Sequence, residues 1–176
     1  DGLVTNVSLI IGFASSGVGG SVVRLAGIAS AVAGAVSMAA GEWVSVKAQN
    51  ELVQREMALE LRELKRNARA ETSELAGIYR SHGMSPEQAT AAATEVMRDP
   101  ERAVMVHARE EFGLDPANLP QPVAVAVVSL VSFLVGAMLP VIPWLSGSGD
   151  SARAASIIIG IVAAAIAGGA IARPSE

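Results

Sequence analysis

The charged residues of this chain are concentrated in its middle, and this segregation limits the folds it can adopt. Residues 47–115 carry ten of the thirteen Lys and Arg residues and thirteen of the seventeen Asp and Glu residues. The two flanks are nearly uncharged, and hydrophobic residues make up 51% of the chain, which is high for a soluble domain. A charged segment between two apolar ones predicts an all-α membrane protein with a water-facing insert.

Charge and cysteine usage exclude several classes of protein. The formal net charge of −4 argues against a nucleic-acid partner, because phosphate binding requires a basic surface. The chain has no cysteine, so neither a disulfide nor a thiolate metal site is available. Two short loops are expected, one between the first and second apolar stretches and one between the third and fourth, and Arg24 and Arg153 are the only basic residues at or beside them, whereas the charged segment holds ten. The positive-inside tendency therefore predicts a multi-pass protein whose insert faces the cytoplasm.

Four apolar stretches predict membrane helices. The first is shorter than the ~20 residues that a bilayer requires, so we interpret it as part of a span whose beginning is missing. The third contains Pro140 and Pro143, which remove backbone donors and are expected to distort the helix. The four stretches are residues 3–14, 22–46, 123–145 and 154–172. The expected domains are membrane helices one and two in 1–46, the insert in 47–119, and membrane helices three and four in 120–176.

The insert carries clear helix signals. Residues 47–76 are rich in helix formers and lack Gly and Pro, so the second span is expected to continue into water, with a break between Lys65 and Thr72. Further start and stop signals predict an insert of three helices. These signals are Gly83, Ser85-Pro86-Glu87, Asp99-Pro100-Glu101 and Gly113.

Two pairs of glutamates in the insert are candidate metal ligands. Glu60 with Glu63, and Glu71 with Glu74, are three residues apart, so each pair shares a helix face. An unbroken helix would align the two pairs, and a hairpin would bring them together around one site. The alternative is that these acids form surface ion pairs with the neighbouring Lys and Arg side chains, which contribute little.

An imidazole strengthens the metal hypothesis. His107 and Glu111 are four residues apart on the last predicted helix, so they project together. Imidazole and carboxylates from neighbouring helices form the ligand set of di-iron carboxylate sites. His82 lies beside a helix end without such partners, and we expect it on the surface.

Three residues of the first two spans are candidates for an ion pathway. Met38 lies on a face of small residues, where it indicates a partner helix or a pore, or fills a packing gap. Glu42 follows one turn later, and Asp1 begins the first span. Ionisable groups in spans are functional candidates, although both acids also fit interfacial positions. The small face comprises Gly27, Ala31, Gly34, Met38 and Gly41.

Several motifs, taken in order, resemble the vacuolar iron transporter family. They extend from the first residue to the fourth span. Besides the two glutamate pairs, they are Asp1-Gly2-Leu3-Val4-Thr5, Gly34-Ala35-Val36-Ser37-Met38, Gly41-Glu42-Trp43-Val44-Ser45-Val46, Glu111-Phe112-Gly113-Leu114 and the Pro140 to Pro143 segment. The resemblance implies a homodimeric transporter, not an enzyme, that exchanges ferrous iron or manganese for protons through a pore at the dimer interface.

The resemblance also implies roles for individual residues. It gives the pore an aspartate at Asp1 and a methionine at Met38, and it gives metal-gathering glutamates to the insert at Glu60, Glu63, Glu71, Glu74 and Glu111. This chain departs from the family pattern where His107 replaces a methionine and where Ser30 replaces a pore glutamate, a role that Glu42 is expected to share. The family's fifth span is absent after Glu176, so we expect a fragment.

The predicted function is transport of Fe²⁺ from the cytoplasm across the lipid bilayer in exchange for protons, with Mn²⁺ and Zn²⁺ as alternative ions. The runner-up is a membrane-anchored iron-binding or ferroxidase-like module without transport. A third hypothesis treats the insert as a structural bundle that docks a partner.

Overall fold

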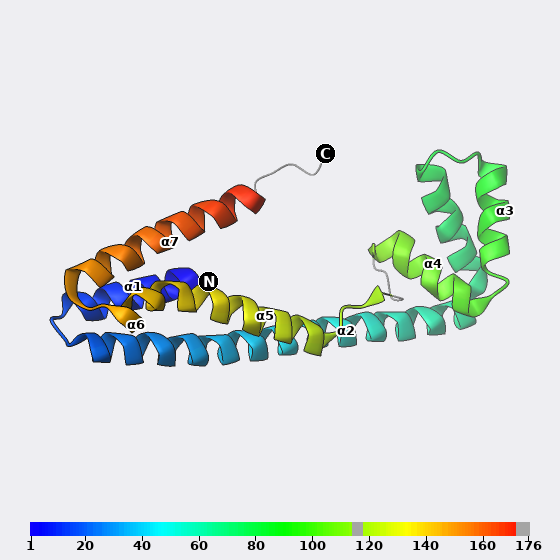
Figure 1. The fold of residues 1–176 in the computed structure, drawn as a ribbon. Coiled ribbons are helices and arrows are strands. Elements are labelled where there is room, and N and C mark those ends of the chain that lie inside the picture. Colours follow the sequence, from blue (N-terminus) through cyan, green and yellow to red (C-terminus); the bar gives the residue numbers. More distant parts are fainter. Residues whose placement is uncertain (114–117, 172–176) are drawn as a thin grey trace. The chain divides into compact units, whose positions relative to one another are not determined.

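The chain folds into two compact units of helices. The computed structural model describes residues 1–113 and 118–171, apart from the side chains of residues 111, 112, 170 and 171. Every regular element within these residues is helical, as the sequence predicts (Figure 1). Asp1–Val44 with Pro122–Glu176 forms one unit, here the apolar unit, and Ser45–Gln121 forms the other, the charged unit. The long helix α2, Gly20–Ser81, supplies residues to both.

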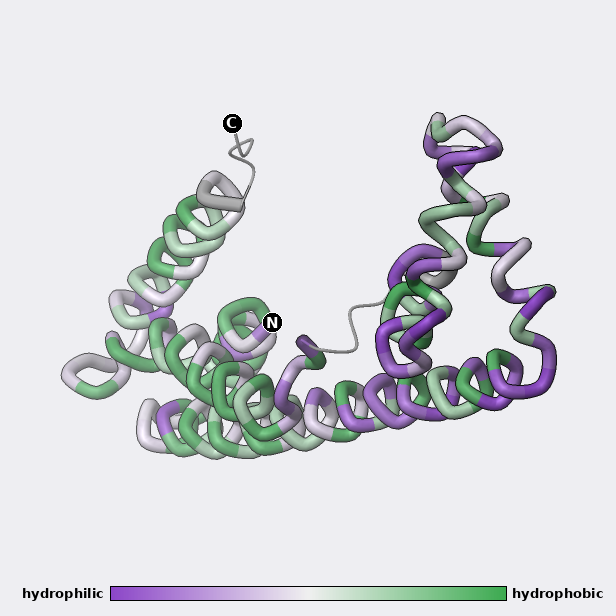
Figure 2. Tube along the Cα trace, turned by 90° about the vertical axis from the view of Figure 1, so that its right-hand side faces the viewer, coloured by the Kyte–Doolittle hydropathy of each residue, from purple (hydrophilic) through white to green (hydrophobic). Residues whose placement is uncertain are grey.

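Three helical segments are long and apolar enough to cross a membrane. They lie in α2, in Pro122–Ser146 and in Gly149–Gly169. The first helix, α1 (Gly2–Ser15), is apolar but has only 14 residues. Figure 2 shows hydrophobic residues along these helices and hydrophilic residues along much of the charged unit. Length and composition therefore support a protein with several membrane helices.

In the apolar unit, α1 packs against α5 (Pro122–Met138) and α7 (Gly149–Ile171). Its buried face comprises Gly2, Asn6 and Ile10, which are spaced by four residues and so follow one side of the helix. A Cβ atom at Gly2 would lie within van der Waals overlap of the Phe133 carbonyl oxygen. This glycine therefore lets the backbones of α1 and α5 approach each other closely.

The small-residue face of α2 packs on α5. Ala31 and Ala35 are buried in a cluster with Phe133, and Met38 packs against that cluster. A Cβ atom at Gly34 would overlap with Cζ of Phe133, so the ring occupies the space that a side chain would fill. Farther along the same face, Gly41 is exposed, with open space around it.

The two prolines break the third span, as predicted. After α5 the chain forms a 3₁₀ turn, η2 (Leu139–Val141), and the short helix α6 (Ile142–Ser146). Backbone carbonyls around this break accept hydrogen bonds from side chains on α1, α2 and α7, which offsets the cost of carbonyl groups in an apolar environment. The donor and acceptor residues are Asn6 and Ala137 at 2.7 Å, Arg24 and Trp144 at 3.2 Å, and Ser156 and Pro140 at 2.7 Å.

The charged unit is built from the rest of α2, α3 (Pro86–Val96) and α4 (Pro100–Phe112). Within α2, Asn67 has non-helical dihedral angles, φ −145° and ψ 53°, so the helix kinks there, inside the stretch where the sequence predicts a break. Ser85 and Gln88 form a capping box at α3, and the Asp99 side chain caps α4. Gly113 ends α4 with φ 64°, a conformation that suits glycine.

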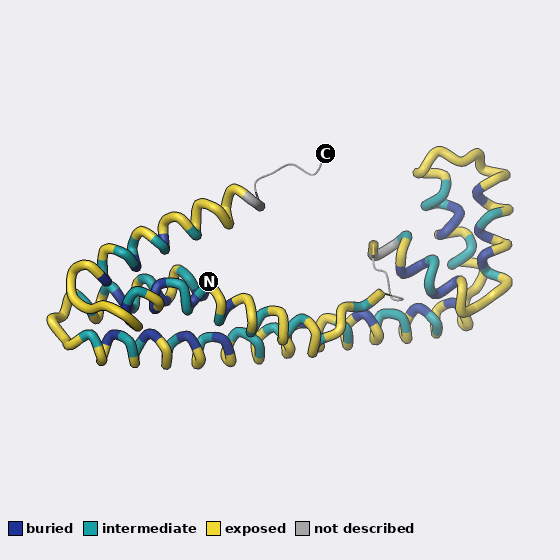
Figure 3. Tube along the Cα trace, viewed as in Figure 1, coloured by how far each residue is buried: buried dark blue, intermediate teal, exposed yellow. Residues whose placement is uncertain are grey.

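The charged unit has a hydrophobic core that uses residues from both sides of the kink. Leu64 precedes Asn67, whereas Leu75 follows it and is fully buried. Alanines of α3 and α4 pack around them, which allows the helices to approach closely. Figure 3 shows these buried positions along the inner faces of α3 and α4. The same packing fixes the polar residues that share these faces.

Candidate metal centre

Three candidate ligands meet inside the charged unit. His107 on α4 lies with its Nδ1 atom 3.1 Å from Oε1 of Glu60 and 4.0 Å from Oε2 of Glu71. One ligand atom from each residue lies within 4.8 Å of the other two. Two donors on one metal ion are about 3 to 4 Å apart when each bond is about 2.1 Å long. The three side chains are therefore close to the spacing of a shared cation site.

The kink in α2 explains how two glutamates eleven positions apart reach one imidazole. Glu60 lies before Asn67 and Glu71 after it, so the two residues come from the two arms of a bent helix. Of the two geometries that the sequence left open, the structure has the bent one. His107 approaches from α4, whose start is fixed by the Asp99 cap.

Burial controls the protonation of this cluster. His107 is fully buried and Glu60 is 6% exposed. Burial lowers the pKa of the His107 imidazole, and the nearby negative charge of Glu74 opposes that shift. The ordinary pKa of histidine is about 6.5. The buried ring has a lower pKa, so it holds its proton less readily than a free histidine. At neutral pH it offers a lone pair, as a metal ligand must.

The hydrogen bonding of His107 also indicates a place for a cation. Neither ring nitrogen makes a hydrogen bond of good geometry within residues 1–113 and 118–171, although Nδ1 faces a carboxylate. Buried polar atoms in native proteins nearly always have a partner. A divalent ion between imidazole and carboxylates would satisfy both kinds of donor atom.

The other predicted metal ligands lie at different distances from this centre. Glu63 is exposed and lines a pocket of about 480 Å³ together with Arg66, Asn67 and Glu71. Glu71 therefore belongs both to the lining of this pocket and to the buried group. Glu74 is exposed, yet close enough to influence the His107 pKa. The side chain of Glu111 lies outside the described part of the chain.

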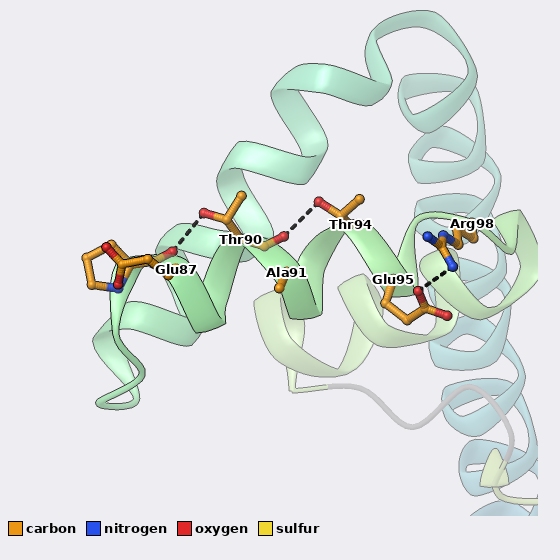
Figure 4. A pocket seen from close by; sticks show the side chains of 7 residues that line it. Glu87, Thr90, Ala91, Thr94, Glu95 and Arg98 are labelled. Atoms are coloured by element: carbon orange, nitrogen blue, oxygen red, sulfur yellow. Dashed lines mark hydrogen bonds and ion pairs between the residues drawn. The ribbon is translucent and has the colours of Figure 1, made fainter.

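A larger hollow, of about 760 Å³, lies along one face of α3 and does not resemble a site. Figure 4 shows that its polar side chains are satisfied locally. Thr90 and Thr94 donate to carbonyl oxygens of their own helix, and Glu95 pairs with Arg98 at 2.8 Å.

The apolar unit contains a second place of interest. Asp1 and Met38 line one cavity of about 230 Å³, together with Ser129 and Ser132 of α5. The Asp1 side chain does not cap α1, so its carboxylate is not committed to the helix that it precedes. The predicted pathway residues Asp1 and Met38 are thus brought together, whereas Glu42 is half-buried and outside the described lining of this cavity.

Some polar residues of the apolar unit were not predicted. Ser129 and Ser132, which line the cavity, lie three residues apart on α5. The surrounding residues of α5 are mostly apolar, so the sequence alone gives little reason to select these two serines. Asn6 is a lone amide in an apolar helix, and Ser156 accepts a hydrogen bond from the Trp144 indole. The sequence signal that could have identified these residues is a polar side chain within an apolar helix. Such a side chain often forms hydrogen bonds between helices, so it does not by itself indicate a functional site.

The chain combines helices that are long and apolar enough to cross a membrane with a buried group of two carboxylates and an imidazole that could hold a metal ion, and sequence comparison gives the family. The profile of the VIT family matches residues 1–176, and the chain belongs to this family. The chain is 34% identical to the vacuolar iron transporter of Acanthamoeba castellanii over 133 residues, which are 76% of this chain and 50% of that protein. It is 28% identical to vacuolar iron transporter 1 of Arabidopsis thaliana over 169 residues, 96% of this chain and 68% of the relative. The chain thus spans about half the length of the Acanthamoeba protein.

Proposed function

We propose that this chain is the part of a transporter that gathers ferrous iron, or manganese, in the cytoplasm and passes it across a membrane in exchange for protons. Membership of the VIT family and the names of the Acanthamoeba and Arabidopsis relatives support iron as the cargo. In this proposal residues 47–119 gather the metal, and the helices of 1–46 and 120–176 carry it.

The observation that carries the proposal is the buried group of Glu60, Glu71 and His107. Two carboxylate oxygens and an imidazole nitrogen are of intermediate softness, which suits Fe²⁺, Mn²⁺ and Zn²⁺ better than Mg²⁺ or Ca²⁺. Glu63 and Glu74 add negative charge on the exposed side, and Glu111 is the remaining expected ligand. This charge would raise the local concentration of cations.

The cavity between Asp1 and Met38 supports a pathway in the apolar unit. A carboxylate supplies charge, and a thioether favours ferrous iron over hard cations. A metal ion displaces protons from any ligand that holds them, so binding and proton release are coupled. That coupling is the basis for exchange, and Glu42 is proposed to hold protons near the same helix.

Orientation and assembly complete the proposal. The excess of basic residues in the insert over the two short loops supports a cytoplasmic charged unit. The exposed, small-residue end of the α2 face, at Gly41, leaves room for a partner helix. This exposed face fits a homodimer in the bilayer, as the family resemblance implies.

Two measurements test this function. Anaerobic calorimetric titration of the purified protein with Fe²⁺, Mn²⁺ or Zn²⁺ is expected to show saturable binding with proton release. In proteoliposomes, an imposed proton gradient is expected to drive Fe²⁺ uptake. Iron binding without gradient-driven uptake, together with oxygen consumption when Fe²⁺ is added in air, would instead support the ferroxidase-like alternative. If no metal binds, the hypothesis that remains is a structural bundle that docks a partner.

A further inference from the structure

Asn6 holds a position in the apolar unit that the proposed transport function does not yet use. It lies on α1 and is 1% exposed. Its Nδ2 atom donates to the carbonyl oxygen of Gly27 on α2 at 3.0 Å and to that of Ala137 on α5 at 2.7 Å. One amide therefore joins three helices. The orientation of this amide is well defined, because its nitrogen must face the two carbonyl acceptors.

These two bonds set the register of α1 on α5. The buried face of α1 meets α5 and the turn η2 that follows it at three levels, and two of the three contacts have no preferred direction. Gly2 approaches the Phe133 backbone without a side chain, and Ile10 packs in an apolar cluster with Val141. Hydrophobic contact is non-directional, whereas a hydrogen bond weakens steeply with distance and angle. The amide is thus the element that prevents α1 from sliding along α5.

The register of α1 in turn places the first residue of the cavity. Asp1 precedes Gly2, and its backbone carbonyl accepts from Thr5 within the first turn of the helix. Asp1, Gly2 and Leu3 all line the cavity that Met38 lines from α2. Because a helix rises by about 1.5 Å per residue, any slip of α1 moves the Asp1 carboxylate relative to the Met38 thioether by a comparable distance.

The amide also has a cost. Its Oδ1 atom is buried and has no hydrogen-bond partner within residues 1–113 and 118–171. A buried oxygen of this kind destabilises a folded protein, and an apolar side chain would avoid it. The two donated bonds offset part of this cost.

We propose that Asn6 is a positioning residue of the ion pathway. Its two interhelical hydrogen bonds hold Asp1 opposite Met38, and it does not touch the ion itself. This proposal rests on the proposed transport function and is tested by two measurements. The first, of Fe²⁺ flux, depends on that function, whereas the second, of the register of α1 on α5, is independent of transport.

The register arm uses a disulfide. The chain contains no cysteine, so an introduced pair provides the only thiols. A Cβ atom at Gly136 of α5 would lie 3.7 Å from Cβ of Leu3, close to the mean separation of about 3.8 Å in disulfides. The double variant Leu3→Cys with Gly136→Cys is expected to cross-link with diamide. Trypsin, which cuts at the Lys and Arg residues between the two positions, then leaves linked fragments on a non-reducing gel.

The expected result combines both arms. Asn6→Leu, similar in size but without donors, is expected to reduce cross-linking of the cysteine pair several-fold. In the cysteine-free protein it is expected to lower the maximal rate of Fe²⁺ flux by about tenfold, the scale on which small misplacements act in active sites. Asn6→Ser, which keeps one donor, is expected to fall between. Ser8→Ala is the matched control, because Ser8 is an exposed α1 residue whose hydroxyl donates only within its own helix.

Some outcomes overturn the proposal. Unchanged flux in Asn6→Leu does so, and so does a loss of flux with unchanged cross-linking. Thermal unfolding in detergent monitors the folding of Asn6→Leu, and Asn6→Ser provides the test if Asn6→Leu fails to fold. If the parent protein itself shows no flux, the proposed function fails, and the cross-linking arm still decides whether Asn6 sets the register.

Discussion

The two units of this chain bury polar side chains for different purposes. In the apolar unit, Asn6 and Ser156 are buried and donate to backbone carbonyls of neighbouring helices. In the charged unit, His107 is equally buried, but it faces carboxylates of Glu60 and Glu71 and makes no good hydrogen bond among the described residues. Polar groups thus join neighbouring helices in the first unit and lie close to the spacing of metal ligands in the second. The contrast predicts that the two units respond separately to mutation.

The largest expected effect follows removal of the Met38 thioether. Met38→Ala is expected to reduce Fe²⁺ flux in proteoliposomes to the background, because the cavity with Asp1 loses its soft ligand. Iron binding by the charged unit is expected to be unchanged in titrations of the same variant. Met84→Ala, at an exposed position of the charged unit, is the control. Undiminished flux would remove Met38 from the pathway and leave transport without a site in the apolar unit.

The second effect concerns the charged unit. His107→Leu is expected to weaken Fe²⁺ binding by at least about a hundredfold. Mutation of a residue that only contacts a metal ligand typically lowers metal affinity by roughly 10- to 100-fold, and loss of a ligand itself is expected to have a larger effect. His82→Leu provides a matched comparison, because His82 is exposed and lies 3.6 Å from Glu110 rather than at the centre. Equal affinities of the two variants in calorimetry would show that the buried imidazole is not a ligand.

Local chemistry explains how much of this fold could be predicted. The starts of α3 and α4 follow from Ser85, Asp99 and the prolines after them, because a cap and its partners lie within four residues. The break in the third span follows from Pro140 and Pro143 for the same reason. Such signals need no knowledge of distant contacts.

The parts that could not be predicted depend on tertiary contacts. The kink falls on Asn67, which is neither Pro nor Gly, and packing of Leu64 and Leu75 into one core accompanies it. Spacing within Glu-x-x-Glu cannot tell which acid points inward, and the structure buries Glu60 but exposes Glu63. Asn6 has no periodic partner in sequence, so only the approach of α2 and α5 reveals its role.

A third prediction tests the close packing of the apolar unit. Gly34→Ala is expected to destabilise the protein by about 1–3 kcal/mol, the usual effect of overpacking, because the new Cβ atom would overlap with the Phe133 ring. Gly12→Ala is the control, since a Cβ atom at that position would extend into open space. Thermal unfolding in detergent measures both, and Phe133→Leu is expected to restore stability to Gly34→Ala. Equal unfolding temperatures for the two alanine variants would contradict the tight contact between α2 and α5.

The smallest effect is the pH dependence that the buried His107 gives to the metal-free protein. Burial lowers the pKa of His107 in the folded state, so below about pH 6.5 the unfolded chain takes up a proton that the folded chain resists. Stability is therefore fully present above that pH and falls as the pH decreases toward the folded-state pKa, by at most about 1.4 kcal/mol per pH unit. Thermal unfolding with a chelator between pH 7.5 and 5 measures this loss, and His107→Leu is expected to reduce it, whereas His82→Leu is not. An identical pH profile in His107→Leu would mean that the imidazole has the same pKa in the folded and the unfolded protein, which would contradict the effect of burial on this side chain.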